Sequence, residues 1–392
     1  MFYGKNCRIC EFYEEEKGKM KNWKKKVLAV LAASALVVTA AGISGCGSEN
    51  QKTKSAPSTR TITDIKGNQV TLPEKVSKIA ITPIPWASIV YVLDGGSSER
   101  IAAVHPSAMT AYKGHLFERL DKHFGTADTK MIGSDFSVNA ESLVNAGVDT
   151  CILWQYQEKD AEKLKQLGIA PVMIYNDNME NLKKSFLIVG DVLGKQDKAQ
   201  ELNAYYDNAY NDINSHKAEV DASDKPTVLF LRTSKLRLQG NDNFMHRALE
   251  MGGAYNPIEQ AALDSNNKEI PMEEVYRMDP DIIFLSNFDK FVPDDLYENR
   301  IAGQDWSTVK AVKNHRVYKV PMGLYRWDAP GVETPLMMKW IAHTLHPEIF
   351  KDIHMKEETR AFYKNFLNLD VSDDDLALIF ADEANKNSRP LD

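Results

Sequence analysis

The sequence contains the same short unit twice, as "NAESLVNAGVDTCILW" and as "PMEEVYRMDPDIIFLS". Each copy places a glutamate before a short apolar helix pattern, a turn with an aspartate and a run of β-forming residues. Glu141 and Glu273 are 132 positions apart, and so are Asp149 and Asp281. A chain that repeats a helix–turn–strand unit in this way is expected to contain two similar α/β lobes.

Strand and helix patterns alternate on both sides of a long helical stretch. A hairpin around Gly67 precedes a buried strand in "KIAITPI", a helix over Trp86–Leu93 and a strand over Thr150–Trp154. After "DASDKP" the alternation resumes, and strands separated by helices of about ten residues predict βα units around parallel sheets. In between, residues 178–220 keep helical spacing with one interruption at Gly194. That spacing predicts a helix of about 25 residues, about 37 Å long, as a stiff connection.

We therefore predict an α/β protein of two Rossmann-like lobes with parallel-rich sheets, joined by one long rigid α-helix. The predicted segments are 1–19 (upstream read-through before a start at Met20), 20–45 (lipoprotein signal peptide), 46–59 (flexible tether), 60–177 (N-terminal α/β lobe), 178–220 (connecting helices with the strut) and 221–392 (C-terminal α/β lobe with C-terminal helices).

The N-terminal region has the pattern of a lipoprotein signal. Lysines up to Lys26 precede an apolar, Ala- and Val-rich stretch from Val27 to Ile43, and small residues lead to Cys46. A basic segment, a short apolar segment and small residues before the cleavage site are typical of secretion. The cysteine at that position predicts lipidation of Cys46 and an extracytoplasmic protein anchored to the cell membrane. The alternative is an uncleaved membrane anchor.

Charge and cysteine usage exclude several classes of protein. The 392 residues carry a net charge of −7, which argues against a nucleic-acid partner. Cys7 and Cys10 have the spacing of half a metal or redox site without a second half, and Cys151 lies in an apolar strand pattern as a buried core residue. We predict no metal site, because His343 and His346 fit a helix end and a pre-proline position. Common motifs of hydrolases, nucleotide-binding enzymes and zinc proteases are absent from the sequence, so we predict a protein that is not an enzyme.

The repeated unit, together with "TITDIKGNQVTLP", "LKQLGIAPVMI" and "WSTVKAVKNHRVY", resembles the signature segments of ABC-importer substrate-binding proteins. The branch is the class III, periplasmic-binding-protein-like one for ferric siderophores, haem and cobalamin, and the resemblance covers Thr59–Phe380. It implies a metal-chelate ligand held between two lobes that move little, no resident cofactor, and a partner consisting of a permease dimer with its ATPase. It also implies that Glu141 and Glu273 dock onto permease arginines. The alternative for either glutamate is the preference of acidic residues for the first turn of a helix.

Candidate ligand-binding residues follow the predicted strands, because ligands of open α/β sheets lie beyond the carboxyl ends of the strands. Aromatic faces suit the apolar edge of a chelate, and guanidinium groups suit its carboxylates. The tryptophans could instead be packed in the core, and Arg232 could pair with a neighbouring acid. By resemblance, Trp154 matches a tryptophan of the cobalamin-binding member of the family. The candidates are Trp86, Trp154, Tyr156, Arg232, Arg237, Tyr325, Arg326 and Trp327.

Two alternatives to this function remain open at the level of the sequence. One is a protein that binds a transition-metal ion directly, and the other is a ligand-sensing lipoprotein that works without a permease. The sequence also does not discriminate between a siderophore, haem and a corrinoid as the chelate.

Overall fold

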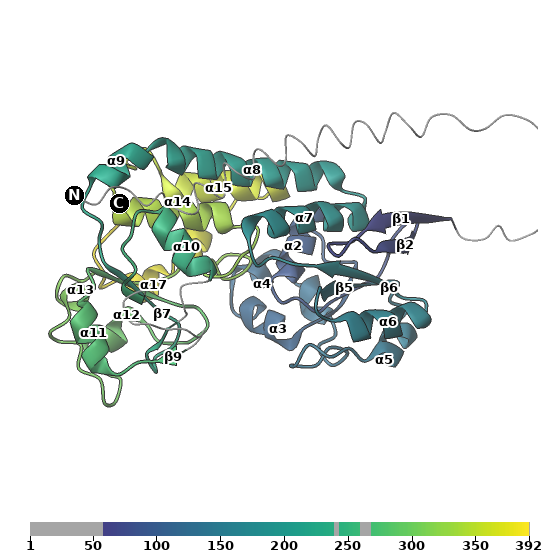
Figure 1. Cartoon of the computed structure of the whole chain (residues 1–392), viewed down its shortest axis with the longest axis horizontal. Coiled ribbons are helices and arrows are strands. Elements are labelled where there is room, and N and C mark those ends of the chain that lie inside the picture. Colours follow the sequence, from purple (N-terminus) through teal and green to yellow (C-terminus); the bar gives the residue numbers. More distant parts are fainter. Residues whose placement is uncertain (1–57, 239–242, 259–267, 392) are drawn as a thin grey trace, which may run out of the picture. The chain divides into compact units, whose positions relative to one another are not determined.

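Two parallel sheets, one in each half of the chain, organise the fold (Figure 1). The computed structural model describes residues 58–238, 243–258 and 268–391, and Thr59–Asp392 forms one structural unit. The predicted read-through segment, signal peptide and Cys46 lie outside the described residues. Among the residues that are described, no helix is long and apolar enough to cross a membrane.

The N-terminal sheet has the strand order β4-β3-β5-β6 and the C-terminal sheet the order β11-β10-β7, with all neighbours parallel. The strands of these sheets are β3 (Ile79–Ile81), β4 (Ile101–Val104), β5 (Thr150–Trp154), β6 (Ala170–Ile174), β7 (Val228–Leu231), β10 (Ile282–Leu285) and β11 (Val317–Lys319). Two antiparallel pairs are separate from them: β1 (Thr59–Thr63) with β2 (Gln69–Pro73), which is the predicted hairpin, and β8 (Arg237–Leu238) with β9 (Lys268–Glu269).

Helices connect the strands and cover the sheets (Figure 1). The helices of the first half are α2 (Trp86–Leu93), α3 (Pro106–Tyr112), α4 (Leu116–Leu120), the 3₁₀ helix η1 (His123–Thr126), α5 (Ala140–Asn145), α6 (Glu158–Gln166) and α7 (Met179–Leu193). They are followed by α8 (Gln196–Ser215), α9 (Lys217–Ala222), α10 (Phe244–Met251), α11 (Met272–Met278), α12 (Pro293–Tyr297), α13 (Lys310–Lys313), α14 (Thr334–Leu345), α15 (Met355–Leu367), α16 (Asp373–Ile379) and α17 (Asp382–Asn385). The predicted α/β class is confirmed, and α2 and β5 have the predicted bounds.

The structure confirms that the repeated unit is built twice in the same way. The backbone N–H of Asp149 donates to the carbonyl of Lys78 at 3.0 Å, and its carboxylate accepts from the N–H of Lys78 at 3.1 Å. Asp281 makes the same reciprocal pair with Thr227, with both distances at 2.8 Å. Each aspartate therefore fixes the start of its own strand, β5 or β10, against the start of the neighbouring strand, β3 or β7.

Helix α8 connects the two lobes, and it runs along one side of both (Figure 1). Helix α7 ends at Gly194, whose φ of 68° supplies the left-handed turn into α8. A Cβ atom at Gly190 would lie 2.6 Å from the Cβ of Ala199, so glycine permits the close approach of α7 and α8. At the other end of α8, Asp212 pairs with Lys339 of α14 at 3.0 Å. The predicted stiff connection is thus a helix packed against both lobes.

The predicted length of this connection, about 25 residues, is wrong. Helix α8 has 20 residues and ends at Ser215, and α9 starts after His216. The sequence has no glycine or proline at this point, so local propensity does not signal the break. The His216 ring packs edge-on against Phe350 at 5.2 Å, and this tertiary contact accompanies the change of direction.

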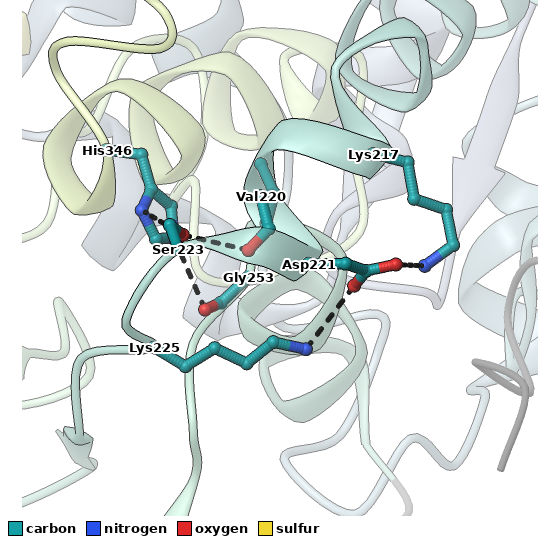
Figure 2. Close-up of polar contacts among 7 residues, drawn as sticks. All are labelled: Lys217, Val220, Asp221, Ser223, Lys225, Gly253 and His346. Atoms are coloured by element: carbon teal, nitrogen blue, oxygen red, sulfur yellow. Dashed lines mark hydrogen bonds and ion pairs between the residues drawn. The ribbon is translucent and has the colours of Figure 1, made fainter. Parts of the chain in front are cut away.

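The end of α9 is attached to the C-terminal lobe through His346 (Figure 2). The hydroxyl of Ser223 donates to the carbonyl of Val220 at 2.8 Å and lies 3.4 Å from Nδ1 of His346. Nε2 of His346 lies 3.3 Å from the carbonyl oxygen of Gly253. A Cβ atom at Gly253, whose φ is 85°, would lie 2.7 Å from that same Nε2. The predicted pre-proline histidine is therefore a structural residue that joins three segments.

The C-terminal helices form a second connection between the lobes, which the sequence did not indicate. Arg119 of α4 pairs with Asp375 of α16 at 2.9 Å. A Cβ atom at Gly96 would meet the side chain of Leu367 in α15 at 3.4 Å. Helices α15 and α16 thus lie against the N-terminal lobe, although they follow the C-terminal sheet in the chain.

We predict that the Asp149→Ala substitution lowers the free energy of unfolding by about 1.5–3 kcal/mol, because charge-assisted hydrogen bonds are lost. The carboxylate accepts from the N–H and the hydroxyl of Ser77, both at 2.7 Å, as well as from Lys78. Urea denaturation measures the change. As a control, Asp370→Ala removes a carboxylate whose side chain is 84% exposed, and we expect a change within about 0.5 kcal/mol. Equal effects of the two substitutions would contradict the structural role of Asp149.

Candidate functional site

Three strands of the C-terminal sheet bring two arginines and an aromatic ring together at their carboxyl ends. Arg232 follows β7, Phe288 follows β10 and Arg326 follows β11. The guanidinium carbon of Arg232 lies 3.9 Å from the centroid of the Phe288 ring, and that of Arg326 lies 4.7 Å from it. These are cation–π distances, so the ring gives both guanidinium groups a fixed position.

A buried carboxylate lies beside the two arginines. Asp328 is 5% exposed and accepts from the hydroxyl of Ser286 and from the N–H of Asn287 at 3.2 Å. Burial raises the pKa of Asp328, while the charges of Arg326 and Arg232 act in the opposite direction. Two guanidinium groups against one carboxylate give this end of the sheet a positive balance.

The described residues hold the two guanidinium groups in different ways. Arg326 donates from Nε to the carbonyl of Asn287 at 3.0 Å, which orients the group. The Arg232 guanidinium lies over the Phe288 ring and interacts electrostatically with Asp328. Among the described residues, none forms a hydrogen bond with this guanidinium group. Burial lowers the pKa of Arg232, as expected for a cation partly removed from water. The pair is suited to accept an anion.

The N-terminal sheet contributes a stacked aromatic pair at the end of β5. The rings of Trp154 and Tyr156 lie 6.2 Å apart with 18° between their planes. Tyr156 is 62% exposed, so it offers an aromatic face to solvent. Such faces suit the apolar edge of a flat or large ligand.

Buried Gln157 holds this aromatic segment in place. Its Oε1 accepts from the N–H of Trp154 at 3.1 Å and from the hydroxyl of Thr82 at 2.5 Å. Its Nε2 donates to the carbonyl of Phe136 at 2.8 Å and to the carboxylate of Asp160 at 3.0 Å. All four hydrogen-bonding positions of the amide are therefore used, which fixes its orientation.

The two lobes meet next to Arg326. Ala111 and Ile84 of the N-terminal lobe pack with Met322 and Tyr325 of the C-terminal lobe. Burial lowers the pKa of His115, at the start of α4, and the charge of Arg326 lowers it further. Arg326 thus lies within electrostatic reach of the N-terminal lobe.

Glu333 holds the loop that carries Tyr325 and Arg326. Its Oε2 accepts from the N–H of Leu324 at 2.9 Å and of Tyr325 at 3.2 Å, and its Oε1 accepts from the hydroxyl of Tyr363 at 2.6 Å. Burial raises the pKa of Glu333 to about 7, although these hydrogen bonds oppose the shift. A Cβ atom at Gly323 would lie 1.8 Å from Oε1, so only glycine fits there.

The structure places three of the predicted ligand residues differently. Trp86 is 0% exposed and packs 5.7 Å from Phe186, and Trp327 is 1% exposed. We remove both from the site, because a side chain without accessible surface cannot contact a ligand. Arg237 pairs with Glu269 at 2.9 Å, so its guanidinium already has a partner.

Five predicted residues do lie at the carboxyl ends of the strands: Trp154, Tyr156, Arg232, Tyr325 and Arg326. The sequence analysis did not include Phe288, although it lies three residues after Leu285, the end of β10. It also missed Gln157 and Glu333, which have no local sequence signal.

Glu141 and Glu273 are both exposed and lie in the first turns of α5 and α11. Helices α5 and α11 belong to different lobes and lie on the side away from α8 (Figure 1). Within the described part of the chain, no group of three His, Cys, Asp or Glu residues could hold a metal ion. Both ring nitrogens of His343 face backbone carbonyls, those of Phe350 at 3.1 Å and Leu391 at 2.9 Å.

Two α/β lobes joined by a packed helix, with an aromatic and cationic site at the strand ends, define a solute-binding fold of the class III type. The sequence profile of the family described as "Periplasmic binding protein" matches residues 86–322. The chain belongs to this family of ABC-importer substrate-binding proteins.

Three relatives illustrate its range. A periplasmic solute binding protein from Veillonella parvula is 36% identical, has a TM-score of 0.81, and is matched over 84% of this chain and 99% of its own. The molybdate-binding protein MolA of Haemophilus influenzae is 23% identical over 82% of this chain and 95% of its own length. The Fe(3+)-citrate-binding protein YfmC of Bacillus subtilis is 24% identical over 76% of this chain and 90% of its own length.

We predict that Glu333 makes the stability of the protein depend on pH. Its folded pKa of about 7 lies above the ordinary 4.5, so its protonation favours the folded state below pH 4.5, and this contribution is lost as the pH rises through 7. Between pH 5 and pH 8 the free energy of unfolding of the unmodified protein should fall by about 2 kcal/mol more than that of the Glu333→Gln variant. Urea denaturation at both pH values measures the difference. If the free energy of unfolding changes equally with pH in the two proteins, Glu333 is not the source of the pH dependence.

Proposed function

We propose that the protein is an extracytoplasmic lipoprotein that captures an anionic metal chelate between its lobes and delivers it to an ABC permease. The observation that carries the ligand class is the pair Arg232 and Arg326 on the ring of Phe288. Guanidinium groups suit carboxylates or other negative groups on the outside of a chelate. The residues described perform no reaction in this proposal, and the protein acts by binding alone.

The aromatic pair of the N-terminal lobe supports a chelate larger than a simple ion. Trp154 and Tyr156 add stacked rings at the end of β5, and aromatic faces stabilise the apolar part of a ligand. Carboxylate-bearing ferric siderophores and haem combine negative groups with an apolar or flat surface, whereas ferric citrate offers mainly negative groups. The Bacillus relative named for ferric citrate is consistent with this class.

A simple oxyanion is the second candidate ligand. The relative named for molybdate and the positive balance of the arginine pair favour it. An oxyanion of this size would engage the guanidinium groups and leave the exposed ring of Tyr156 unused. The two candidates therefore differ in whether the aromatic pair contributes to binding.

Membrane attachment and docking complete the proposal. Lipidation of Cys46 would tether the protein through residues 46–59, as the sequence pattern before Cys46 indicates. Glu141 and Glu273, exposed at matching positions of two lobes, would meet the two subunits of a permease dimer. A permease and an ATPase encoded beside the gene would distinguish transport from sensing.

We predict that ferric citrate, a carboxylate siderophore or haem binds to the purified protein, and that Arg326→Ala weakens binding by about 1–3 kcal/mol, the usual scale for a buried anchor. Trp154→Ala should weaken binding of a chelate by a similar amount, because it removes the stacked face. Native mass spectrometry against each compound and molybdate identifies the ligand, and quenching of tryptophan fluorescence measures affinity. If Arg326→Ala binds with parental affinity, the site lies elsewhere. If only molybdate binds and Trp154→Ala has no effect, the ligand is an oxyanion.

We predict that the double variant Glu141→Arg with Glu273→Arg abolishes uptake of the ligand into cells and leaves its affinity for the purified protein unchanged. Charge reversal places like charges together at a docking surface, which removes orientation and slows association. Uptake of a radiolabelled chelate and fluorescence titration are the two measurements. As a control, Glu298→Arg reverses a glutamate on the C-terminal lobe that lies outside α5 and α11 and pairs with Arg300. Undiminished uptake by the double variant would remove the docking assignment.

A further inference from the structure

Large apolar side chains are rarely exposed in the described residues, and four of the five exposed ones form two pairs. Two of them, Tyr156 and Phe288, belong to the ligand site and occupy positions 132 apart. Two others, Val144 and Tyr276, are 42% and 39% exposed and are also 132 positions apart. The fifth, Leu167, has a polar residue, Asn299, at the corresponding position. Each lobe therefore exposes an apolar side chain at the same two positions, one within the repeated unit and one two residues after it.

The second pair lies next to the docking glutamates. Val144 is in α5, one helical turn after Glu141, and Tyr276 is in α11, one turn after Glu273. Residues three apart lie on the same face of a helix. In both helices the residue before each exposed apolar side chain, Leu143 or Val275, is 0% exposed and fixes the helix to its lobe. Each lobe thus presents a carboxylate and an apolar side chain on one exposed helix face.

Both apolar side chains are held rigidly. The hydroxyl of Tyr276 donates to the backbone carbonyl of Asp305 at 2.7 Å, which fixes its ring. Val144 is β-branched and has one strongly preferred rotamer in a helix. Preordered side chains lose little conformational entropy on binding, so they are effective anchors.

We propose that Val144 and Tyr276 are apolar anchors of the docking interface, and that each inserts into the same apolar pocket of one of two symmetry-related permease subunits, beside the arginines that receive the glutamate. This inference rests on the proposed docking to a permease. A partner with two equivalent subunits presents the same pocket twice, which matches a protein that presents the same carboxylate and apolar pair twice. The glutamates would set orientation and rate of association, and the apolar pair would add affinity by burial.

The affinity test uses the mature protein and the permease–ATPase complex of the producing bacterium in lipid nanodiscs. We expect Val144→Ser and Tyr276→Ser each to raise the dissociation constant at least about fivefold, the scale of a contributing interface residue. Leu167→Ser is the matched control, since it removes an apolar side chain of equal exposure, 42%, without a counterpart in the other lobe. Tyr276→Phe keeps the ring and should retain most of the affinity. Unchanged affinity in both serine variants would overturn the inference.

A cross-linking test examines the symmetry directly. Val144→Cys and Tyr276→Cys are each labelled with a benzophenone maleimide, while Cys151 is fully buried and stays unlabelled. Photolysis in the complex should attach both labels to the same permease peptide. Different peptides, or no cross-link from either position, would overturn the proposed pocket while leaving docking through the glutamates intact. If Glu141→Arg with Glu273→Arg binds the complex normally, the docking proposal itself fails and this inference with it.

Discussion

The packing of helix α8 against α7 and α14 determines the position of the two sheets relative to each other. Its first turns approach α7 so closely that Gly190 has no room for a side chain beside Ala199. Farther along, the hydroxyl of Tyr206 donates to the carbonyl of Gly331, and Asp212 pairs with Lys339. A 20-residue helix is about 30 Å long and resists bending. These contacts at its two ends therefore hold the lobes at one fixed distance. Helices α15 and α16 reinforce it from the C-terminal lobe. The spacing of the lobes is therefore set by contacts within the protein, and a ligand held between them, as proposed, would meet preordered surfaces.

The C-terminal lobe brings two positive charges close together. Arg232 and Arg326 repel each other, and burial already lowers the pKa of Arg232. The Phe288 ring offers its negative face to both groups, and Asp328 neutralises part of their charge. These charges lie in a partly desolvated setting, where electrostatic interactions are stronger than in water. This arrangement supports the proposed anionic ligand, because an anion beside the pair would reduce the repulsion between the two guanidinium groups.

The sequence predicted those features that depend on periodicity and on position relative to a strand. The duplicated unit, β5 and α2 follow from local patterns, and so do the positions of Trp154 and Arg326 at or after predicted strands; their role in binding stays a prediction. Features decided by distant contacts could not be predicted. Helix α8 ends at Ser215, where His216 meets Phe350, and no local residue signals this break. Trp86 and Trp327 follow strands in the sequence, yet packing against other elements buries them. Glu333 and Gln157 look ordinary in sequence because their partners, such as Tyr363 and Phe136, are distant in the chain.

The duplicated unit also connects the two proposed surfaces of the protein. In each lobe, one strand, β5 or β10, separates the exposed apolar residue beside a glutamate from the exposed aromatic residue of the ligand site. Val144 and Tyr156 are 12 positions apart, and so are Tyr276 and Phe288. A strand of four or five residues spans about 15 Å, so ligand and docking contacts lie at a fixed short distance within a lobe. The distance between the two glutamates, however, is set between lobes, by α8 and by the C-terminal helices. A partner that contacts both glutamates, as proposed, would therefore contact two lobes whose spacing is held by α8 and by α15 and α16.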